Sequence, residues 1–228
     1  LKSCPKILIF DHSLVRNAPP RTLASGIADG IAKWYEASLV SSCSNDGFIQ
    51  QAVQMARVLR DQLFIDGVEA FKDSSSDSWI RVSEACALTA GLIGGIGGVN
   101  CRTAAAHPIH NGFTQLKFSK AALHGEIVGF GLIIQLQLEE LYSSNKLAKQ
   151  AKKQLINFLN ELNLPISIDT LGLTDTSATN IKKACNFTCN YQSEFNSLPF
   201  YISEDMLYDS IKNTKIYHNE KRYSNIKN

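Results

Sequence analysis

Hydrophobic residues along this chain recur mostly at the three- and four-residue spacing of amphipathic helices. After Pro20, the residues Leu23, Ile27, Ile31 and Trp34 follow this spacing, and proline suits the first turn of a helix. The same periodicity predicts further helices over Asp46–Ile65, Trp79–Leu92, Arg102–Phe113, His124–Tyr142, Lys146–Leu162, Ser177–Thr188 and Ser203–Lys212. In the helix after Asp46, the residues expected to face the core are Phe48, Val53, Ala56, Leu59 and Leu63. The pattern therefore predicts a mainly α protein.

The first residues depart from the helical pattern. The segment KILIF (residues 6–10) reads as a short buried strand. A lone strand has no neighbour to pair with, and no second clear strand follows it. We therefore expect this strand to belong to the sheet of a preceding domain that is missing from this sequence.

Composition narrows the class of partner. The 23 Lys and Arg against 21 Asp and Glu give a formal net charge of +2, which provides no electrostatic case for binding nucleic acid. Six scattered cysteines and no signal-peptide pattern favour reduced thiols and a cytoplasmic protein. No apolar run reaches the length of a membrane span, so no membrane partner is expected. The glycine-rich residues 91–98 are expected to end a helix, because a phosphate-binding loop would follow a strand.

Four polar residues on apolar segments are the candidates for chemistry. His107, His110 and His124 lie close together in the sequence, and Asp29 lies in an apolar helical run far upstream. Taken singly, Asp29 could simply pair with Lys33 on a solvated helix face, and the histidines could be hydrogen-bonded core residues. Taken together, two imidazoles and a carboxylate favour one shared divalent cation over unrelated buried polar groups. Such a donor set leaves a coordination position open to water or substrate.

The segments that carry these residues resemble a known family. AAAHPIHNGFTQL followed by ALHGEIVGFGLIIQL is similar to the carboxy-terminal signature of glycerol dehydrogenases, a metal-dependent branch of the iron-containing alcohol dehydrogenase superfamily. RTLASGIADGIAKWYEA resembles the upstream segment that carries the carboxylate ligand of this family. The resemblance covers roughly residues 7–138 and includes the order and spacing of the motifs.

The resemblance implies a role for each candidate residue. The metal ligands of the family fall on Asp29, His107 and His124, and His110 matches a histidine beside the site that could relay a proton or line the pocket. The iron-type relatives place a histidine where this chain has Lys33, so Zn²⁺ is favoured over Fe²⁺.

The resemblance also implies a domain organisation. Residues 1–18 would be the remnant strand and linker of an N-terminal Rossmann-like domain that binds NAD, residues 19–215 an all-helical metal and substrate domain, and residues 216–228 a polar tail. The expected fold class is thus the helical metal-binding domain of a two-domain dehydrogenase. Family members commonly form homo-oligomers, so a homo-oligomer is expected here.

The implied reaction is the oxidation of a small polyol such as glycerol. A divalent metal ion would lower the pKa of the substrate hydroxyl, and the alkoxide would pass a hydride to NAD. This chain alone is expected to be inactive. Two alternatives stay open: a dehydrogenase of the same superfamily that acts on glycerol phosphate or another short alcohol, and a non-catalytic helical interaction domain.

Overall fold

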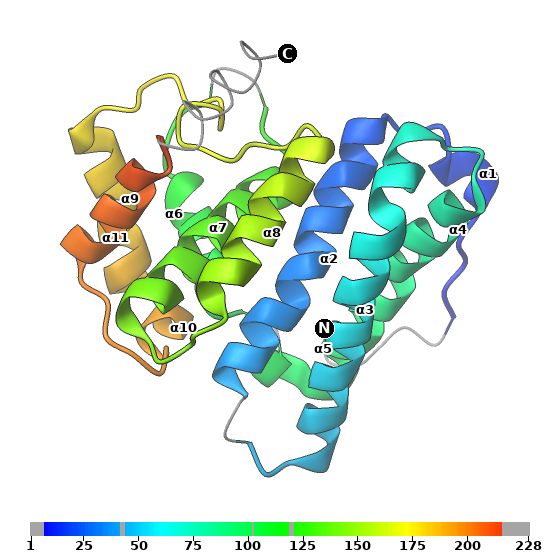
Figure 1. Ribbon diagram of the computed structural model, residues 1–228, viewed down its shortest axis with the longest axis horizontal. Coiled ribbons are helices and arrows are strands. Elements are labelled where there is room, and N and C mark those ends of the chain that lie inside the picture. Colours follow the sequence, from blue (N-terminus) through cyan, green and yellow to red (C-terminus); the bar gives the residue numbers. More distant parts are fainter. Residues whose placement is uncertain (1–6, 42–43, 102, 119–120, 216–228) are drawn as a thin grey trace. The chain divides into compact units, whose positions relative to one another are not determined.

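The structure is a computed structural model that describes residues 7–41, 44–101, 103–118 and 121–215 (Figure 1). Within these ranges the chain is helical, and its β structure is limited to an isolated antiparallel bridge between Phe118 and Leu173. The chain divides into two compact units, Leu1–Thr103 and Ala104–Asn228. The predicted mainly α fold is confirmed. The polar tail expected over residues 216–228 lies outside the described residues.

The first unit is built around two long helices. Its α-helices are α1 (His12–Val15), α2 (Pro20–Val40), α3 (Gly47–Lys72), α4 (Asp77–Glu84) and α5 (Ala90–Gly97). A π-helical turn over Ala85–Thr89 joins α4 to α5, and a 3-10 turn over Gly98–Cys101 follows. Figure 1 shows α2 and α3 side by side. A Cβ on Gly30 would lie 2.7 Å from Leu63 Cδ1, so the absence of a side chain at Gly30 permits this close packing.

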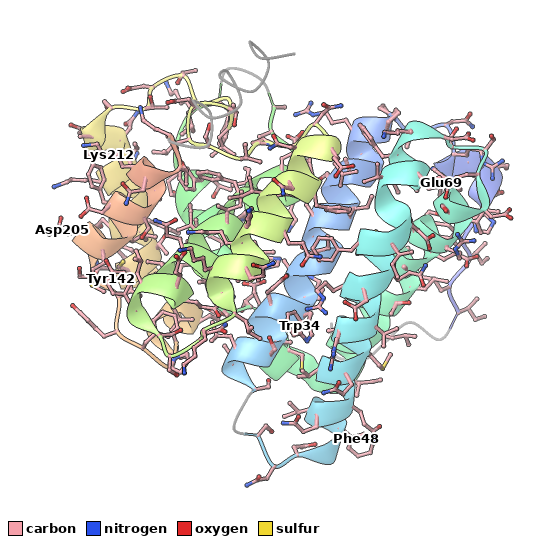
Figure 2. All side chains as sticks on the ribbon, viewed as in Figure 1. Trp34, Phe48, Glu69, Tyr142, Asp205 and Lys212 are labelled. Carbon is pink, nitrogen blue, oxygen red and sulfur yellow. The ribbon has the colours of Figure 1, made fainter. Side chains whose placement is uncertain are left out.

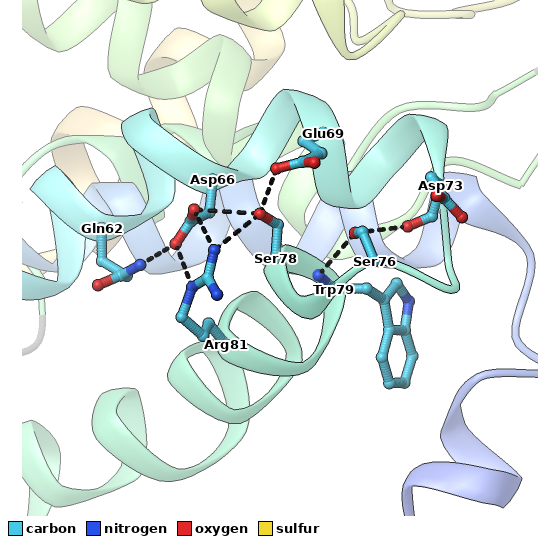
Figure 3. Close-up of polar contacts among 8 residues, drawn as sticks. All are labelled: Gln62, Asp66, Glu69, Asp73, Ser76, Ser78, Trp79 and Arg81. Atoms are coloured by element: carbon cyan, nitrogen blue, oxygen red, sulfur yellow. Dashed lines mark hydrogen bonds and ion pairs between the residues drawn. The ribbon is translucent and has the colours of Figure 1, made fainter.

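Side-chain caps fix where the predicted helices start. The Asp46 carboxylate accepts hydrogen bonds from the backbone N–H groups of Phe48 and Ile49 at 2.8 and 3.3 Å, and α3 begins at the next residue. The Ser76 hydroxyl accepts from the Trp79 N–H at 3.2 Å, so α4 begins at Asp77 (Figure 3). These contacts satisfy N–H groups that have no partner inside the helix.

An ion pair between a half-exposed arginine and a buried aspartate ties α3 to α4 (Figure 3). Arg81 donates from Nε and Nη2 to the two carboxylate oxygens of Asp66 at 2.9 and 2.8 Å, and the Ser78 hydroxyl donates to the same carboxylate at 3.2 Å. The Asp66 side chain is only 8% exposed. The hydrogen bond from Arg81 is the main reason that the pKa of Asp66 lies below its ordinary value.

Three details of the first unit differ from the sequence predictions. Phe48 was expected in the core but is 71% exposed, because it lies in the first turn of α3, at the free end of that helix (Figure 2). Residues 7–10 form no strand, and Ile7 and Ile9 are largely exposed. A strand needs a neighbour to hydrogen-bond, and no strand is assigned in the described ranges. The helix predicted over Trp79–Leu92 extends over residues 77–97 and contains the π turn.

That helical run, Asp77–Gly97, also has the length and hydropathy of a membrane span. Its most apolar window has a mean hydropathy of 1.2, and 28% of that window is buried. No segment of this kind was predicted from the sequence. Length and composition alone do not distinguish a spanning helix from a core helix of a soluble protein.

The second unit packs around a central apolar helix. Its helices are α6 (Ala106–Phe113), α7 (His124–Tyr142), α8 (Ala148–Glu161), α9 (Ala178–Tyr191), α10 (Ser193–Asn196) and α11 (Glu204–Asn213). Every residue of α7 from Gly125 to Glu139 is buried. Phe113 of α6, Phe130 and Ile134 of α7, and Ile211 of α11 belong to one hydrophobic core. Burial on all sides explains why α7 shows little division into polar and apolar faces.

The helix predicted to begin at Arg102 begins at Ala106 instead. Pro108 therefore lies in the first turn of α6, where its missing N–H removes no intrahelical hydrogen bond. The N–H groups of Ala105 and Ala106 are satisfied from α7, because Gln135 Oε1 accepts from both at 3.3 and 3.1 Å. A side chain of α7 thus determines where α6 starts.

Candidate metal site

Three histidines of α6 and α7 meet in the second unit. His107 and His110 lie three residues apart on α6, and His124 is the first residue of α7. The ring centroid of His124 is 5.4 Å from that of His107 and 4.3 Å from that of His110. His110 Nε2 lies 3.0 Å from His124 Nδ1, within hydrogen-bond distance. The second unit therefore brings together all three histidines that the sequence singled out.

Close packing of α6 on α7 holds these rings in place. A Cβ on Gly131 would lie 2.6 Å from the carbonyl oxygen of Ala106, so glycine is needed for the two backbones to approach this closely. The hydrogen bonds from the Ala105 and Ala106 N–H groups to Gln135 also join the start of α6 to α7. At the start of α7, the Glu126 carboxylate accepts from the Leu123 N–H at 2.8 Å. These contacts fix the backbone beside His107 and His124.

The geometry of His107 and His124 suits two ligands of one cation. An imidazole nitrogen binds Zn²⁺ at about 2.1 Å, so two tetrahedral imidazole ligands have ring centroids roughly 5–6 Å apart. The observed 5.4 Å lies in this range, with the ring planes inclined by 46°. His107 is half-buried and His124 is exposed, so the pair can be reached from solvent. Neutral imidazole is a common ligand for zinc and other divalent metals.

Two polar residues behind the histidines, Asn111 and Gln192, were not predicted from the sequence. His110 Nδ1 lies 3.0 Å from Asn111 Oδ1, and Asn111 Nδ2 donates to Gln192 Oε1 at 2.7 Å. Asn111 could have been noticed as a polar neighbour of His110, although its pairing with Gly112 more readily indicates the end of a helix. Gln192 carries no such signal, because it follows α9 and is 81 positions further along the chain.

Asp29, the predicted carboxylate ligand, belongs to the first unit. It is half-buried on α2, and Lys33 Nζ donates to its Oδ1 at 3.3 Å. This is the helical Asp–Lys ion pair that the sequence also predicts as the alternative to a metal ligand. The histidines belong to the second unit, so a coordination sphere that Asp29 shares with His107 and His124 stays a prediction.

The first unit also contains an apolar cavity of about 320 Å³. Phe10, Leu23, Trp79 and Cys86 are among the residues that line it. Burial, and to a smaller extent the charge of Asp29, raises the pKa of the Cys86 thiol to about 12. The thiol is therefore protonated at neutral pH, which argues against a nucleophilic role.

Comparisons with known proteins place the chain among dehydrogenases and reductases. No protein-family model matches the chain. It is 46% identical over 216 residues to an uncharacterized oxidoreductase, slr1167, of Synechocystis sp., and covers 56% of that protein. It is 30% identical to glycolaldehyde reductase of Halobacterium salinarum, with 56% of that protein covered, and 26% identical to glycerol dehydrogenase of Pseudomonas putida, with 58% covered. These matches include 91–95% of this chain, which thus spans little more than half the length of these relatives.

Solved structures show the same relationship. The chain matches glycerol dehydrogenase from Schizosaccharomyces pombe with a TM-score of 0.80 and 25% identity, covering 94% of this chain and 55% of that one. A probable glycerol dehydrogenase from Sinorhizobium meliloti matches with a TM-score of 0.77 and 26% identity, covering 92% of this chain and 59% of that one. By sequence and by fold, the chain is similar to glycerol dehydrogenases and matches the carboxy-terminal helical domain of these enzymes.

Proposed function

We propose that this chain supplies the metal and substrate site of an NAD-linked dehydrogenase that oxidises a small polyol such as glycerol. The observation that carries the proposal is the meeting of His107 and His110 of α6 with His124 at the start of α7. This cluster occurs in a chain whose relatives include glycerol dehydrogenases. A cytoplasmic homo-oligomer is proposed as the working form.

In this proposal Asp29, His107 and His124 hold one divalent cation. One carboxylate and two imidazoles leave a position open for the substrate oxygen, as in catalytic zinc sites. When bound, the cation supplies Lewis-acid stabilisation of the developing alkoxide. Zn²⁺ is proposed over Fe²⁺, because Lys33 occupies the position of the additional histidine in iron-type relatives. NAD would be held by the part of the longer enzyme that lies outside the match.

His110 is proposed as the residue that lines the substrate pocket or passes a proton. Its Nε2 atom already contacts His124 at 3.0 Å, and its other ring nitrogen contacts Asn111. Hydrogen bonds at both ring nitrogens restrict the rotation of the imidazole. A ring held in this way has a fixed orientation, and passing a proton to a bound hydroxyl would require one of these two nitrogens to release its partner.

Titration of the purified chain with zinc tests the metal site. We expect about one zinc per chain, and at least tenfold weaker binding in His107→Ala, His124→Ala and Asp29→Asn, because each variant removes either an imidazole ligand or the negative charge of the carboxylate ligand. His12→Ala is the matched control, since His12 lies beside Glu84 in the first unit and should leave zinc binding unchanged.

Three results of this titration would contradict the proposal. A chain that takes up no zinc would refute the metal site, and equal loss in His12→Ala would show that the effect is not specific. If Asp29→Asn bound zinc as tightly as the wild type while the histidine variants did not, the assignment of Asp29 would be wrong.

A second substrate class has its own support. The relative named glycolaldehyde reductase is 30% identical to this chain, whereas the glycerol dehydrogenase of Pseudomonas putida is 26% identical. Reduction of a short hydroxyaldehyde is the reverse of the oxidation of a short diol, so the same site would serve both reactions. The ratio of kcat/KM for glycerol oxidation to that for glycolaldehyde reduction, measured with the complete enzyme, distinguishes the two classes.

A further inference from the structure

A line of hydrogen bonds runs from the backbone at the end of α9 to His124. Gln192 Nε2 donates to the carbonyl oxygen of Tyr191 at 3.1 Å, and Gln192 Oε1 accepts from Asn111 Nδ2 at 2.7 Å. Asn111 Oδ1 lies 3.0 Å from His110 Nδ1, and His110 Nε2 lies 3.0 Å from His124 Nδ1. All of these residues belong to the second unit.

The order of donors along this line is determined from its far end. The carbonyl oxygen of Tyr191 can only accept, so it fixes which side of the Gln192 amide carries the nitrogen. The Gln192 oxygen then faces Asn111, and the Asn111 amide must present its nitrogen to Gln192 and its oxygen to His110. That oxygen accepts, so His110 must carry its proton on Nδ1.

The position of the proton on each of the two rings follows from the Asn111 oxygen. A neutral imidazole has one N–H group and one lone pair, so a proton on His110 Nδ1 leaves the lone pair on Nε2. His110 Nε2 therefore accepts from His124, whose proton must be on Nδ1. The lone pair of His124 is then on Nε2, the nitrogen at the opposite side of its ring from His110.

We infer that Asn111 and Gln192 are positioning residues that act through His110 to hold His124 in the Nδ1–H form, with its Nε2 atom ready to bind a cation. This inference rests on the proposed metal site. A ligating histidine must be deprotonated at the binding nitrogen, and the partner of its other nitrogen sets the tautomer. In the opposite tautomer, a proton would occupy the nitrogen that binds the metal.

Tight packing of α9 on α6 keeps the line in register. A Cβ on Gly112 would lie 2.6 Å from the carbonyl oxygen of Ala184, so the two backbones are in close contact beside Asn111. The Thr188 hydroxyl lies 3.3 Å from the carbonyl oxygen of Pro108 and forms a second link between the helices. Gln192 follows directly after α9. The packing of α9 on α6 therefore fixes the distance between the backbones of Gln192 and Asn111.

The test compares two variants at one position. Asn111→Leu has nearly the shape of asparagine but removes the acceptor for His110, whereas Asn111→Asp keeps an acceptor oxygen there. Asn190→Leu is the matched control, because Asn190 is another asparagine of the second unit, and it bonds to Asn186 and Glu204 outside the line. Two measurements are made on each protein: the imidazole ¹H–¹⁵N correlation spectrum without metal, at a pH where the rings are neutral, and the zinc affinity.

The wild-type spectrum should show His124 protonated on Nδ1, with the signal identified by its loss in His124→Gln. Asn111→Leu should populate the Nε2–H form and weaken zinc binding about tenfold or more, the usual loss when the hydrogen-bond partner behind a metal ligand is removed. Asn111→Asp should retain the wild-type tautomer, and Asn190→Leu should change neither measurement.

The outcomes separate this inference from the proposed function. A wild-type His124 protonated on Nε2, or an Asn111→Leu variant with an unchanged tautomer, overturns the inference even if zinc binds. An Nδ1–H form in a protein that binds no zinc refutes the metal site but leaves the order of hydrogen bonds intact. If Asn111→Leu does not fold, a wild-type His124 protonated on Nε2 still overturns the inference.

Discussion

Gly131→Ala tests how closely α6 and α7 must approach. The new Cβ would lie 2.6 Å from the carbonyl oxygen of Ala106, whereas ordinary contacts of this kind begin at 3.4 Å. The helices must therefore separate by up to 0.8 Å, the difference between these two distances. Overpacking of this kind costs about 1–3 kcal/mol, and replacing glycine within a helix returns about 1 kcal/mol. We expect a net loss of about 1 kcal/mol and a fall in Tm of about 4 °C.

The same shift should weaken zinc binding, because His107 directly follows Ala106 and metal–ligand distances tolerate only about 0.2 Å. Circular dichroism measures the thermal transition, and titration measures zinc affinity. Trp34 and Trp79 both lie in the first unit, so a transition seen by circular dichroism but not by tryptophan fluorescence belongs to the second unit.

Gly94→Ala is the control for this prediction. Gly94 lies within α5, and a Cβ there would have no neighbour within 4 Å, so the variant should gain about the 1 kcal/mol of helix propensity without overpacking. A Gly131→Ala protein that gains as much stability as Gly94→Ala and binds zinc normally would refute the reasoning.

Three further predictions follow from buried polar groups. Because the pKa of Asp66 is lowered in the folded state, its contribution to stability is present above the ordinary carboxylate pKa near 4 and is lost as pH falls through the lowered value. The free energy of unfolding, measured with denaturant from pH 6 to pH 2, should therefore depend less on pH in Arg81→Met than in the wild type. An equal pH dependence in the two proteins would contradict this prediction. Burial raises the pKa of Cys185 to about 12, so mass spectrometry should find this thiol alkylated at pH 8 only after unfolding. Gln135→Leu leaves two buried N–H groups at the start of α6 unpaired and should lower the free energy of unfolding, measured by chemical denaturation, by about 2 kcal/mol. Gln137→Leu should lower it less, because the Gln137 amide accepts from the side chain of Lys152 and not from a buried backbone N–H group.

The sequence predicted the helices well where caps and periodicity agree. Pro20, Asp46, Ser177 and Ser203 each stand at or directly before the start of a helix, as their chemistry predicts. Phe48 was assigned wrongly because periodicity shows which side of a helix is apolar but not where the neighbouring helix ends.

The candidate site was predictable only where it depends on local helical spacing. The spacing of His107 and His110 places both on one face of a helix, and each ring contacts His124. The contact between Asn111 and Gln192 depends on how α6 and α9 pack, and no local pattern contains that information. The place of Asp29 beside the histidines stays a prediction.

The π turn over Ala85–Thr89 has a consequence for anyone who aligns related sequences. Such a turn amounts to one extra residue in an α-helix, so the apolar positions before and after it are out of step by about 100°. A relative without the turn would need a single-residue gap here, in the middle of an uninterrupted helix. An alignment that forbids gaps inside helices would then place the core residue Ile93 opposite a solvent-facing position.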